Sequence, residues 1–290
     1  MTARYTRRVI DAPPRQPLFI DADLARALEH AEAEACRAFG EAAARLYPTG
    51  GIRSVAAAGG FAIFYGPSDP LNAVKGPGLA GPVDPADWDA AEALYRPSNS
   101  PVIVDLCPLA DDAFVAMLSS RGYSIGSFET VTTRRLGPRE SFPTPPASPG
   151  LAIREVGAAE AKSWSRVLDL GFANGGEPMR FAVDIGAVRA AMPNARMLLA
   201  TIDGTPAGGA GMSIHGEVAL MSGAAVLPAF RGRGIQQALT AARLRIAQEH
   251  ACRWAKLDVR AGSPSYRNAV RAGFQVAYTR PQLVRNWHAV

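Results

Sequence analysis

The segment Arg-Gly-Arg-Gly-Ile-Gln, residues 231–236, joins a hydrophobic run to a run with helical spacing. The first backbone N–H groups of a helix have no partner inside the helix, and the helix dipole adds positive potential there. Glycines at 232 and 234 let a ligand approach the backbone closely. With the charges of Arg231 and Arg233 beside them, these groups suit a pyrophosphate.

Other interpretations of this segment lead to different functions. A solvated surface turn would also use glycine and arginine, and it stays open at this stage. Nucleic-acid segments of the RGG type are repeated and disordered, whereas this segment is single and flanked by ordered patterns. The pattern GxxxxGK[ST] is absent, and the predicted helix does not follow the first strand of a βαβ unit, which excludes two common phosphate loops.

Hydrophobic periodicity places the segment inside a mixed α/β unit in the second half of the chain. The dipeptides at 203–204 and 215–216 indicate hairpin turns. The predicted elements of this half are a strand at 151–156, helices at 158–172 and 178–191, strands at 196–202, 205–214 and 217–227, a helix at 234–249, a strand at 254–260, a helix at 263–273 and strand character over 274–286.

The first half repeats much of this order, and a segment with five prolines, residues 136–150, separates the two. A long helix capped by Asp21 or Asp23 opens it. "SRGYSIGSF" at 120–128 echoes "RAGFQVAYT" at 271–279, which indicates an internal duplication. The other elements predicted in this half are strands at 52–58, 61–66, 101–106 and 123–136, and helices at 85–96 and 111–122.

"VLPAFRGRGIQ", residues 226–236, resembles the acetyl-CoA motif of the Gcn5-related N-acetyltransferases (GNAT), [Q/R]-x-x-G-x-[G/A] after a strand that ends in V-x-P. Arg231 and Gly234 match, whereas Gln236 stands where Gly or Ala is usual. The order of elements over 151–287 and "RAGF" at 271–274 extend the resemblance. It implies two GNAT-like domains in tandem in an α/β (α+β) fold, each a mixed, mostly antiparallel twisted sheet flanked by helices, with two strands closing the second domain.

The resemblance implies acetyl-CoA as the cofactor of the second half. The pyrophosphate would lie on the amides of residues 232–236, and Arg231 or Arg233 would meet the 3′-phosphate. Pantetheine would lie where the strand before the motif diverges from the next strand. The implied contacts are Ala224, Val226, Arg231, Gly232, Arg233, Gly234, Ile235, Gln236, Ser263 and Asn268, although Ser263 suits a helix N-cap equally well.

Acetyl transfer needs a neutral amine, a stabilised oxyanion and a proton for the leaving thiolate. The tyrosine that supplies this proton in the family falls at Ala269, so the usual general acid is absent. Tyr278 is the replacement that we predict, and Glu177, in a Gly-rich loop, is the predicted base. The loss of the tyrosine leaves a second hypothesis open, a non-catalytic acyl-CoA-binding regulatory protein.

The first half has prolines and no arginine where the phosphate turn would lie, within "KGPGLAGPVDP" at 75–85. We therefore predict a degenerate GNAT-like domain without a cofactor site at 1–137, a Pro-rich linker at 138–150 and an acetyl-CoA-binding GNAT domain at 151–290. An unrelated α/β domain is the alternative for the first half.

Composition limits the partners. The chain of 290 residues has a net charge of +5, but its basic residues are spread out, which disfavours nucleic acid. Three scattered cysteines and four histidines show no metal-ligand spacing, and the N-terminus lacks an apolar run typical of a signal peptide. We expect a cytoplasmic monomer or homodimer without metal, nucleic-acid or membrane partners, acting on a small-molecule amine or a protein amine.

Overall fold

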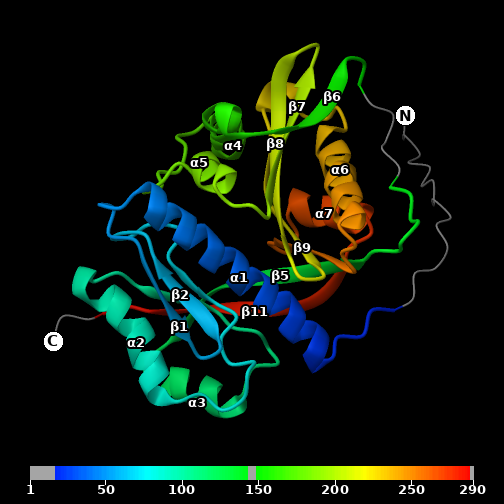
Figure 1. Ribbon diagram of the computed structural model, residues 1–290. Helices are drawn as coiled ribbons and strands as arrows, with labels where there is room; N and C mark the ends of the chain where they lie inside the picture. The colour runs from blue at the N-terminus through cyan, green and yellow to red at the C-terminus, as the bar shows by residue number, and fades with distance from the viewer. Residues whose placement is uncertain (1–16, 143–147, 288–290) are drawn as a thin grey trace, which may run out of the picture.

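The computed structural model describes residues 17–142 and 148–287 (Figure 1). The N-terminal segment 1–16 and residues 143–147 of the predicted linker lie outside the described residues. The strands are β1 (Arg53–Ala57), β2 (Gly60–Phe64), β3 (Ala73–Lys75), β4 (Val102–Asp105), β5 (Ser124–Arg135), β6 (Leu151–Val156), β7 (Ala195–Ile202), β8 (Thr205–His215), β9 (Val218–Val226), β10 (Trp254–Val259) and β11 (Gln275–Arg285). The helices are α1 (Ala22–Leu46), α2 (Pro85–Tyr95), α3 (Asp112–Ser120), α4 (Ala161–Ala173), α5 (Ile185–Ala190), α6 (Ile235–Glu249) and α7 (Pro264–Arg271).

The strands form one continuous sheet in the order β1-β2-β3-β4-β11-β5-β10-β9-β8-β7-β6. Most neighbours are antiparallel, and the pairs β3–β4 and β9–β10 are parallel. The predicted mixed, mostly antiparallel architecture is confirmed. The sequence did not predict that the sheets of the two halves would join.

The join is made by the last strand of each half. β5 pairs with β10 of the second half, and β11 pairs with both β5 and β4. The expectation of two strands after α7 is wrong for the described residues, because β11 runs unbroken from Gln275 to Arg285. β5 takes the place beside β10, so no strand edge is exposed between the halves.

β9 and β10 pair along only part of their length. Their register covers Trp254↔Val218, Ala255↔Ala219 and Lys256↔Leu220, although β9 continues to Val226 and β10 to Val259. The two strands therefore diverge beyond Leu220 and Lys256. This divergence opens a gap in the middle of the second half's sheet.

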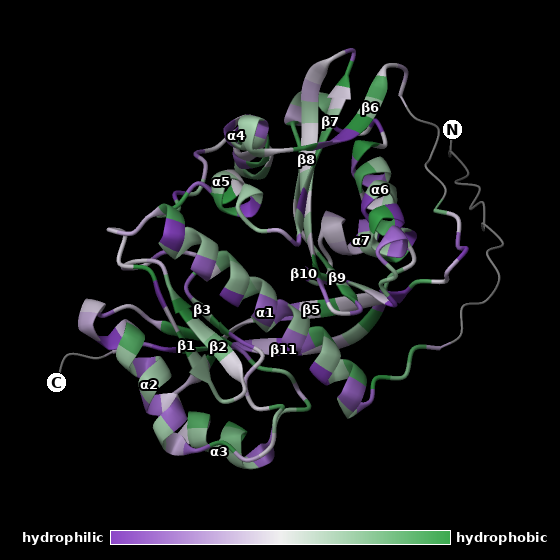
Figure 2. Cartoon of the chain, viewed as in Figure 1, coloured by the Kyte–Doolittle hydropathy of each residue, from purple (hydrophilic) through white to green (hydrophobic). Residues whose placement is uncertain are grey.

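Helices cover both faces of this sheet (Figure 1). In the second half α6 and α7 pack on one face, while α4 and α5 pack on the other. α1 contacts β1, β2 and β3 of the first half and β8 and β9 of the second. Hydrophilic and hydrophobic residues alternate along α1 in Figure 2, as expected for a helix with one buried side.

Each half has a large hydrophobic cluster in its interior. One lies between α6 and the strands of the second half and includes Leu198, Met212 and Leu239. The other lies under α2 and α3 and includes Trp88 and Phe114. None of the helices within residues 17–142 and 148–287 is both long enough and apolar enough to cross a membrane.

Candidate active site

The N-terminus of α6 has no side-chain cap. Its N-cap is Gly234, in the left-handed region at φ 74°, and its first turn carries no acidic residue. The backbone N–H groups of residues 232–236 donate to no acceptor in the described part of the chain. In contrast, a side-chain oxygen accepts from the first turn of five other helices, supplied by Asp21, Asp84, Asp111, Asp184 and Ser263.

The two arginines of this turn differ in their surroundings. The Arg231 guanidinium donates to the carbonyls of Gly171 at 2.9 Å and Val226 at 3.2 Å, and to the side chain of Asn174. Arg231 therefore ties the turn to the end of α4. Arg233 is exposed, lies 5.5 Å from the Phe230 ring and has no carboxylate partner among the described residues.

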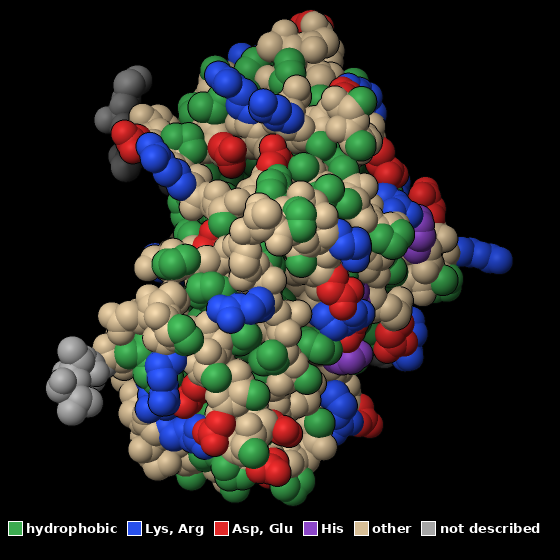
Figure 3. All heavy atoms as spheres, turned by 60° about the vertical axis from the view of Figure 1, so that its left-hand side comes forward, with side chains coloured by type: hydrophobic (Ala, Val, Ile, Leu, Met, Phe, Trp, Pro, Cys, Tyr) green, Lys and Arg blue, Asp and Glu red, His purple; other side chains and the backbone are tan. Residues whose placement is uncertain are grey.

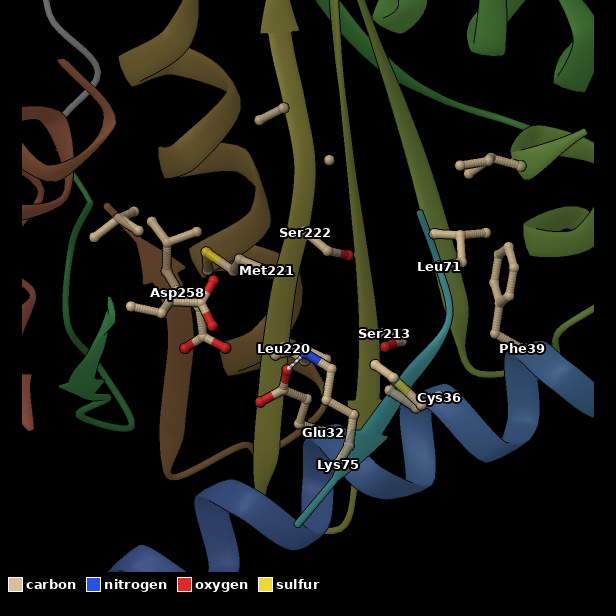
Figure 4. Close-up of a pocket in the computed structure, with 18 of the residues that line it drawn as sticks. Glu32, Cys36, Phe39, Leu71, Lys75, Ser213, Leu220, Met221, Ser222 and Asp258 are labelled. Atoms are coloured by element: carbon tan, nitrogen blue, oxygen red, sulfur yellow. Dashed lines mark ion pairs between the residues drawn. The ribbon is translucent and has the colours of Figure 1, made fainter. Parts of the chain in front are cut away.

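A cavity of about 550 Å³ lies at the β9–β10 gap and continues beneath α1 into the first half. Figure 4 shows side chains from α1, β3 and both sides of the gap around it. Three of the predicted contacts, Ala224, Gln236 and Asn268, line it. Ser263 instead caps α7, where its hydroxyl accepts from Tyr266 N at 3.1 Å, and Ser265 reaches the cavity.

Gly223 lies at the cavity in a β-bulge. The register of β8 and β9 passes from Ala210↔Ala224 to Gly211↔Ser222, which leaves Gly223 without a cross-strand partner. Its φ of 52° belongs to the left-handed region that favours glycine. The bulge breaks the ladder of β9 beside the gap.

A buried charge cluster lies beside the cavity at α1, and four of its members, Glu32, Lys75, Glu129 and Asp258, line the cavity. It contains two more carboxylates than cations. Arg280 lies at its centre, with Nη1 2.8 Å from carboxylate oxygens of Glu29 and Glu32. The cluster consists of Glu29, Glu32, Asp105, Glu129 and Asp258 with Lys75, Lys256 and Arg280.

Asp258 is the member of this cluster at the gap. Its Oδ2 accepts from Lys256 Nζ at 3.0 Å and Arg280 Nη2 at 3.1 Å, whereas Oδ1 is buried without a hydrogen-bond partner among the described residues. Burial raises the pKa of Asp258 to about 7, against the opposing effect of Lys256. We did not predict a functional role for Asp258 from the sequence. The available signal was a charged pair with strand spacing, Lys256 and Asp258, inside an otherwise apolar strand.

The predicted catalytic residues lie elsewhere. The Tyr278 hydroxyl donates to Glu29 Oε1 at 2.7 Å inside the buried cluster, and burial next to Glu29 raises the pKa of Tyr278. Tyr278 is not among the described residues that line the cavity, and Glu177 is exposed in the loop after α4. Neither residue is brought to the gap. Ala269 does line the cavity, so the position of the family's tyrosine holds a methyl group.

The corresponding turn of the first half, around Gly78, is closely packed against its neighbours. Gly78 N–H donates to the Ala58 carbonyl at 2.8 Å, and a Cβ at Gly78 would lie 2.5 Å from the Phe114 ring. The Asp84 side chain caps α2. These contacts occupy N–H groups that could otherwise donate to an anion.

Acidic and basic side chains are interspersed on the face of the molecule drawn in Figure 3, and no continuous basic patch is visible there. Among the described residues, no group of three or more His, Cys, Asp or Glu side chains has the arrangement of a metal site.

Comparison with known proteins places this site in a family. Residues 171–274 match the model of the Acetyltransferase (GNAT) family. No curated protein sequence matches the chain. A tandem GNAT protein from the clavulanic acid biosynthesis pathway shares the fold with a TM-score of 0.60 and 16% identity, over 91% of this chain and 93% of that one. A GCN5-related N-acetyltransferase from Kribbella flavida shares it with a TM-score of 0.58 and 20% identity, over 87% and 96%. At these identities the two structures establish the fold alone. The second half therefore contains a domain that matches the Acetyltransferase (GNAT) family over residues 171–274, and the chain has the fold of the tandem GNAT protein over most of its length.

Proposed function

We propose that the protein transfers the acetyl group of acetyl-CoA to a primary amine of a small molecule. The observation that carries the proposal is the uncapped N-terminus of α6, which lies next to a gap in the sheet that leads into a cavity. An uncapped helix N-terminus with exposed amides attracts phosphate. A gap between diverging strands offers backbone groups to an amide-containing arm.

The proposed cofactor contacts follow from this arrangement. The amides of residues 232–236 and the Arg233 side chain would hold the pyrophosphate and the 3′-phosphate. The pantetheine arm would lie along β9 near Ala224 and Val226, with Asn268 on the opposite side. Because Arg231 is occupied at the end of α4, we assign it the role of fixing the turn.

The cavity supports direct transfer to the amine. Cys36 is a cysteine that lines the cavity, but burial raises the pKa of its thiol to about 11, so the thiolate is rare at neutral pH. An acyl-enzyme on Cys36 is therefore disfavoured. The bulged backbone at Gly223 is the proposed donor to the thioester oxyanion, because backbone N–H groups outside the ladder can point at a ligand.

The enclosure of the cavity favours a small acceptor over a protein lysine. α1 and the segment 65–75 of the first half form part of its wall, and Phe39 and Leu71 point into it (Figure 4). Its volume lies within the range of small-molecule pockets, roughly 300 to 1,000 Å³. The first half thereby contributes to the acceptor site, although it has no phosphate turn of its own.

A calorimetric titration of the full chain with acetyl-CoA, followed by a thiol-release screen over amines, tests the proposal. We expect one binding site per chain and thiol release that depends on both acetyl-CoA and an amine. Binding without release for any amine would favour the non-catalytic acyl-CoA-binding protein, which the methyl group of Ala269 in the tyrosine's place makes the second candidate. Absence of binding would refute both.

A further inference from the structure

Two unpaired polar groups of opposite charge lie at the same cavity. Asp258 Oδ1 is a buried acceptor without a donor, and Arg189 Nε is a buried donor without an acceptor, among the described residues. Both residues line the cavity. Leaving such groups unpaired costs about 1–3 kcal/mol each, and more for charged groups, so their presence calls for an explanation.

The strand register places these two groups on the same face of the sheet. Leu220 of β9 pairs in parallel with Lys256 of β10, and Ser222 and Asp258 each lie two residues further along. Since side chains alternate along a strand, Ser222 and Asp258 face the side on which Lys256 meets Glu32 of α1. Arg189 Nη2 donates to Ser222 Oγ at 2.7 Å. Arg189 and Asp258 therefore flank the gap from its two sides.

Arg189 is positioned for an anion. It forms no ion pair with any carboxylate of residues 17–142 and 148–287, and burial lowers the pKa of its guanidinium to about 10. Within the described part of the chain, Arg243, which is 1% exposed, donates only to uncharged oxygens, and the charge of Arg189 lowers its pKa further. Gly211 allows this approach, because a Cβ there would lie 3.0 Å from Arg189 Nη1. Two neighbouring guanidinium groups without a counter-ion favour a bound anion.

Asp258 is positioned for a cation. It belongs to the cluster with two more carboxylates than cations, and its free Oδ1 is the acceptor that the cluster presents at the gap. An ammonium group has three N–H donors and would satisfy this oxygen.

We infer that the acceptor is a small zwitterionic amine, whose ammonium group binds Asp258 Oδ1 and whose carboxylate binds Arg189. The inference rests on the proposed function and names its substrate class. Phe39, Leu71 and Met192 line the same cavity and would contact an apolar body between or beside the two charged ends.

Asp258 then also accepts a proton. The ammonium gives one proton to Oδ1 and becomes a neutral amine. Its nitrogen attacks the thioester carbonyl carbon, a C–N bond forms and the C–S bond breaks. The leaving thiolate takes the second proton lost by the nitrogen, and Asp258 returns its proton to water. The products are an amide, a thiol and one released proton, and no tyrosine at position 269 is needed.

The test compares matched acceptors by thiol release with acetyl-CoA. The probes are leucine, β-leucine and 4-aminobutyrate, each beside its own carboxamide, so that three spacings of amine and carboxylate are covered. For at least one spacing we expect the acid to exceed its amide by about 30-fold or more in kcat/KM, as for a buried ion pair. Arg189→Gln should bring this ratio to within about threefold by slowing the acid alone. Asp258→Asn should slow the acid and the amide alike.

Arg196→Gln is the matched control, because Arg196 donates to the carbonyls of Pro193 and Ala195 and does not line the cavity in the described residues. It should keep the wild-type ratio. Amides that react as fast as acids in the wild type would overturn the inference while leaving acetyl transfer intact, and this comparison needs no variant to fold. Equal slowing of acids and amides by Arg189→Gln would also overturn it, by assigning Arg189 to the oxyanion. If acetyl-CoA binds but no amine reacts, acetyl transfer itself fails and the inference falls with it.

Discussion

Replacing Asp258 by Asn should remove a pH-dependent limb from the reaction. The active form of Asp258 is ionised, because only a carboxylate can accept the proton of the ammonium. With a pKa of about 7, its ionised fraction rises from about a tenth at pH 6 to about nine tenths at pH 8. We therefore expect kcat/KM of the wild type to rise about tenfold across this range and then to level off.

The assay is thiol release at saturating acetyl-CoA and low acceptor concentration, since kcat/KM for the acceptor then reports groups of the enzyme–acetyl-CoA complex before the acceptor binds. Asp258→Asn should lower kcat/KM at pH 8 by about a hundredfold or more, within the range for losing a general base, and should show no rise between pH 6 and pH 8. Glu177→Gln, which changes an exposed loop carboxylate, should reproduce the wild-type profile.

Two results would contradict the proposed role of Asp258 as the proton acceptor. A wild-type profile that keeps rising tenfold per pH unit beyond pH 8.5 would mean that the amine must lose its proton in solution. An Asn variant with the wild-type profile would mean that Asp258 only completes the buried charge cluster.

Three further substitutions test other parts of the site. Gly234→Glu should weaken acetyl-CoA binding at least about a hundredfold in a titration, because a carboxylate would repel the pyrophosphate and because φ 74° disfavours a side chain by about 1–2 kcal/mol; unchanged affinity in a folded variant would place the ligand elsewhere. Gly211→Ala should lower kcat/KM for zwitterionic acceptors without changing acetyl-CoA affinity, because its Cβ would displace Arg189; equal kinetics would show that Arg189 needs no fixed position. Tyr278→Phe should keep turnover within about twofold and lower the free energy of unfolding by about 1–3 kcal/mol, because Glu29 loses a hydrogen bond; a tenfold loss of turnover would make Tyr278 catalytic after all.

Local signals in the sequence were sufficient to predict the uncapped turn at the start of α6. The glycine at position 234, the missing cap and the adjacent strand and helix all depend on residues within a short stretch. The same holds for the Ser263 cap, since it depends on the residues that begin α7.

The proposed acceptor site could not be predicted from local sequence signals, because residues far apart in the chain form it. Burial and the charge of Glu32 on α1, in the other half of the chain, raise the pKa of Asp258, whereas the neighbouring Lys256 lowers it. Arg189 lacks a counter-ion because, among the described residues, the folded chain brings no carboxylate next to its guanidinium group. Neither environment leaves a periodic pattern in the sequence.

One inserted residue in β11 interrupts the alternation of side chains before Tyr278 and changes the face of the sheet on which Tyr278 lies. The register of β11 against β5 passes from Val276↔Thr132 to Tyr278↔Val131, so Ala277 is an extra residue in a bulge. A bulge reverses which face the following side chains occupy. Tyr278 accordingly points to Glu29 under α1.

A crystal structure of the full chain with CoA would show whether the second half binds acetyl-CoA at the N-terminus of α6. We predict density for the pyrophosphate on the amides of residues 232–236 and for the pantetheine arm between β9 and β10, with one CoA per chain. CoA bound at the turn around Gly78 in the first half, or outside the β9–β10 gap, would contradict the proposed binding site.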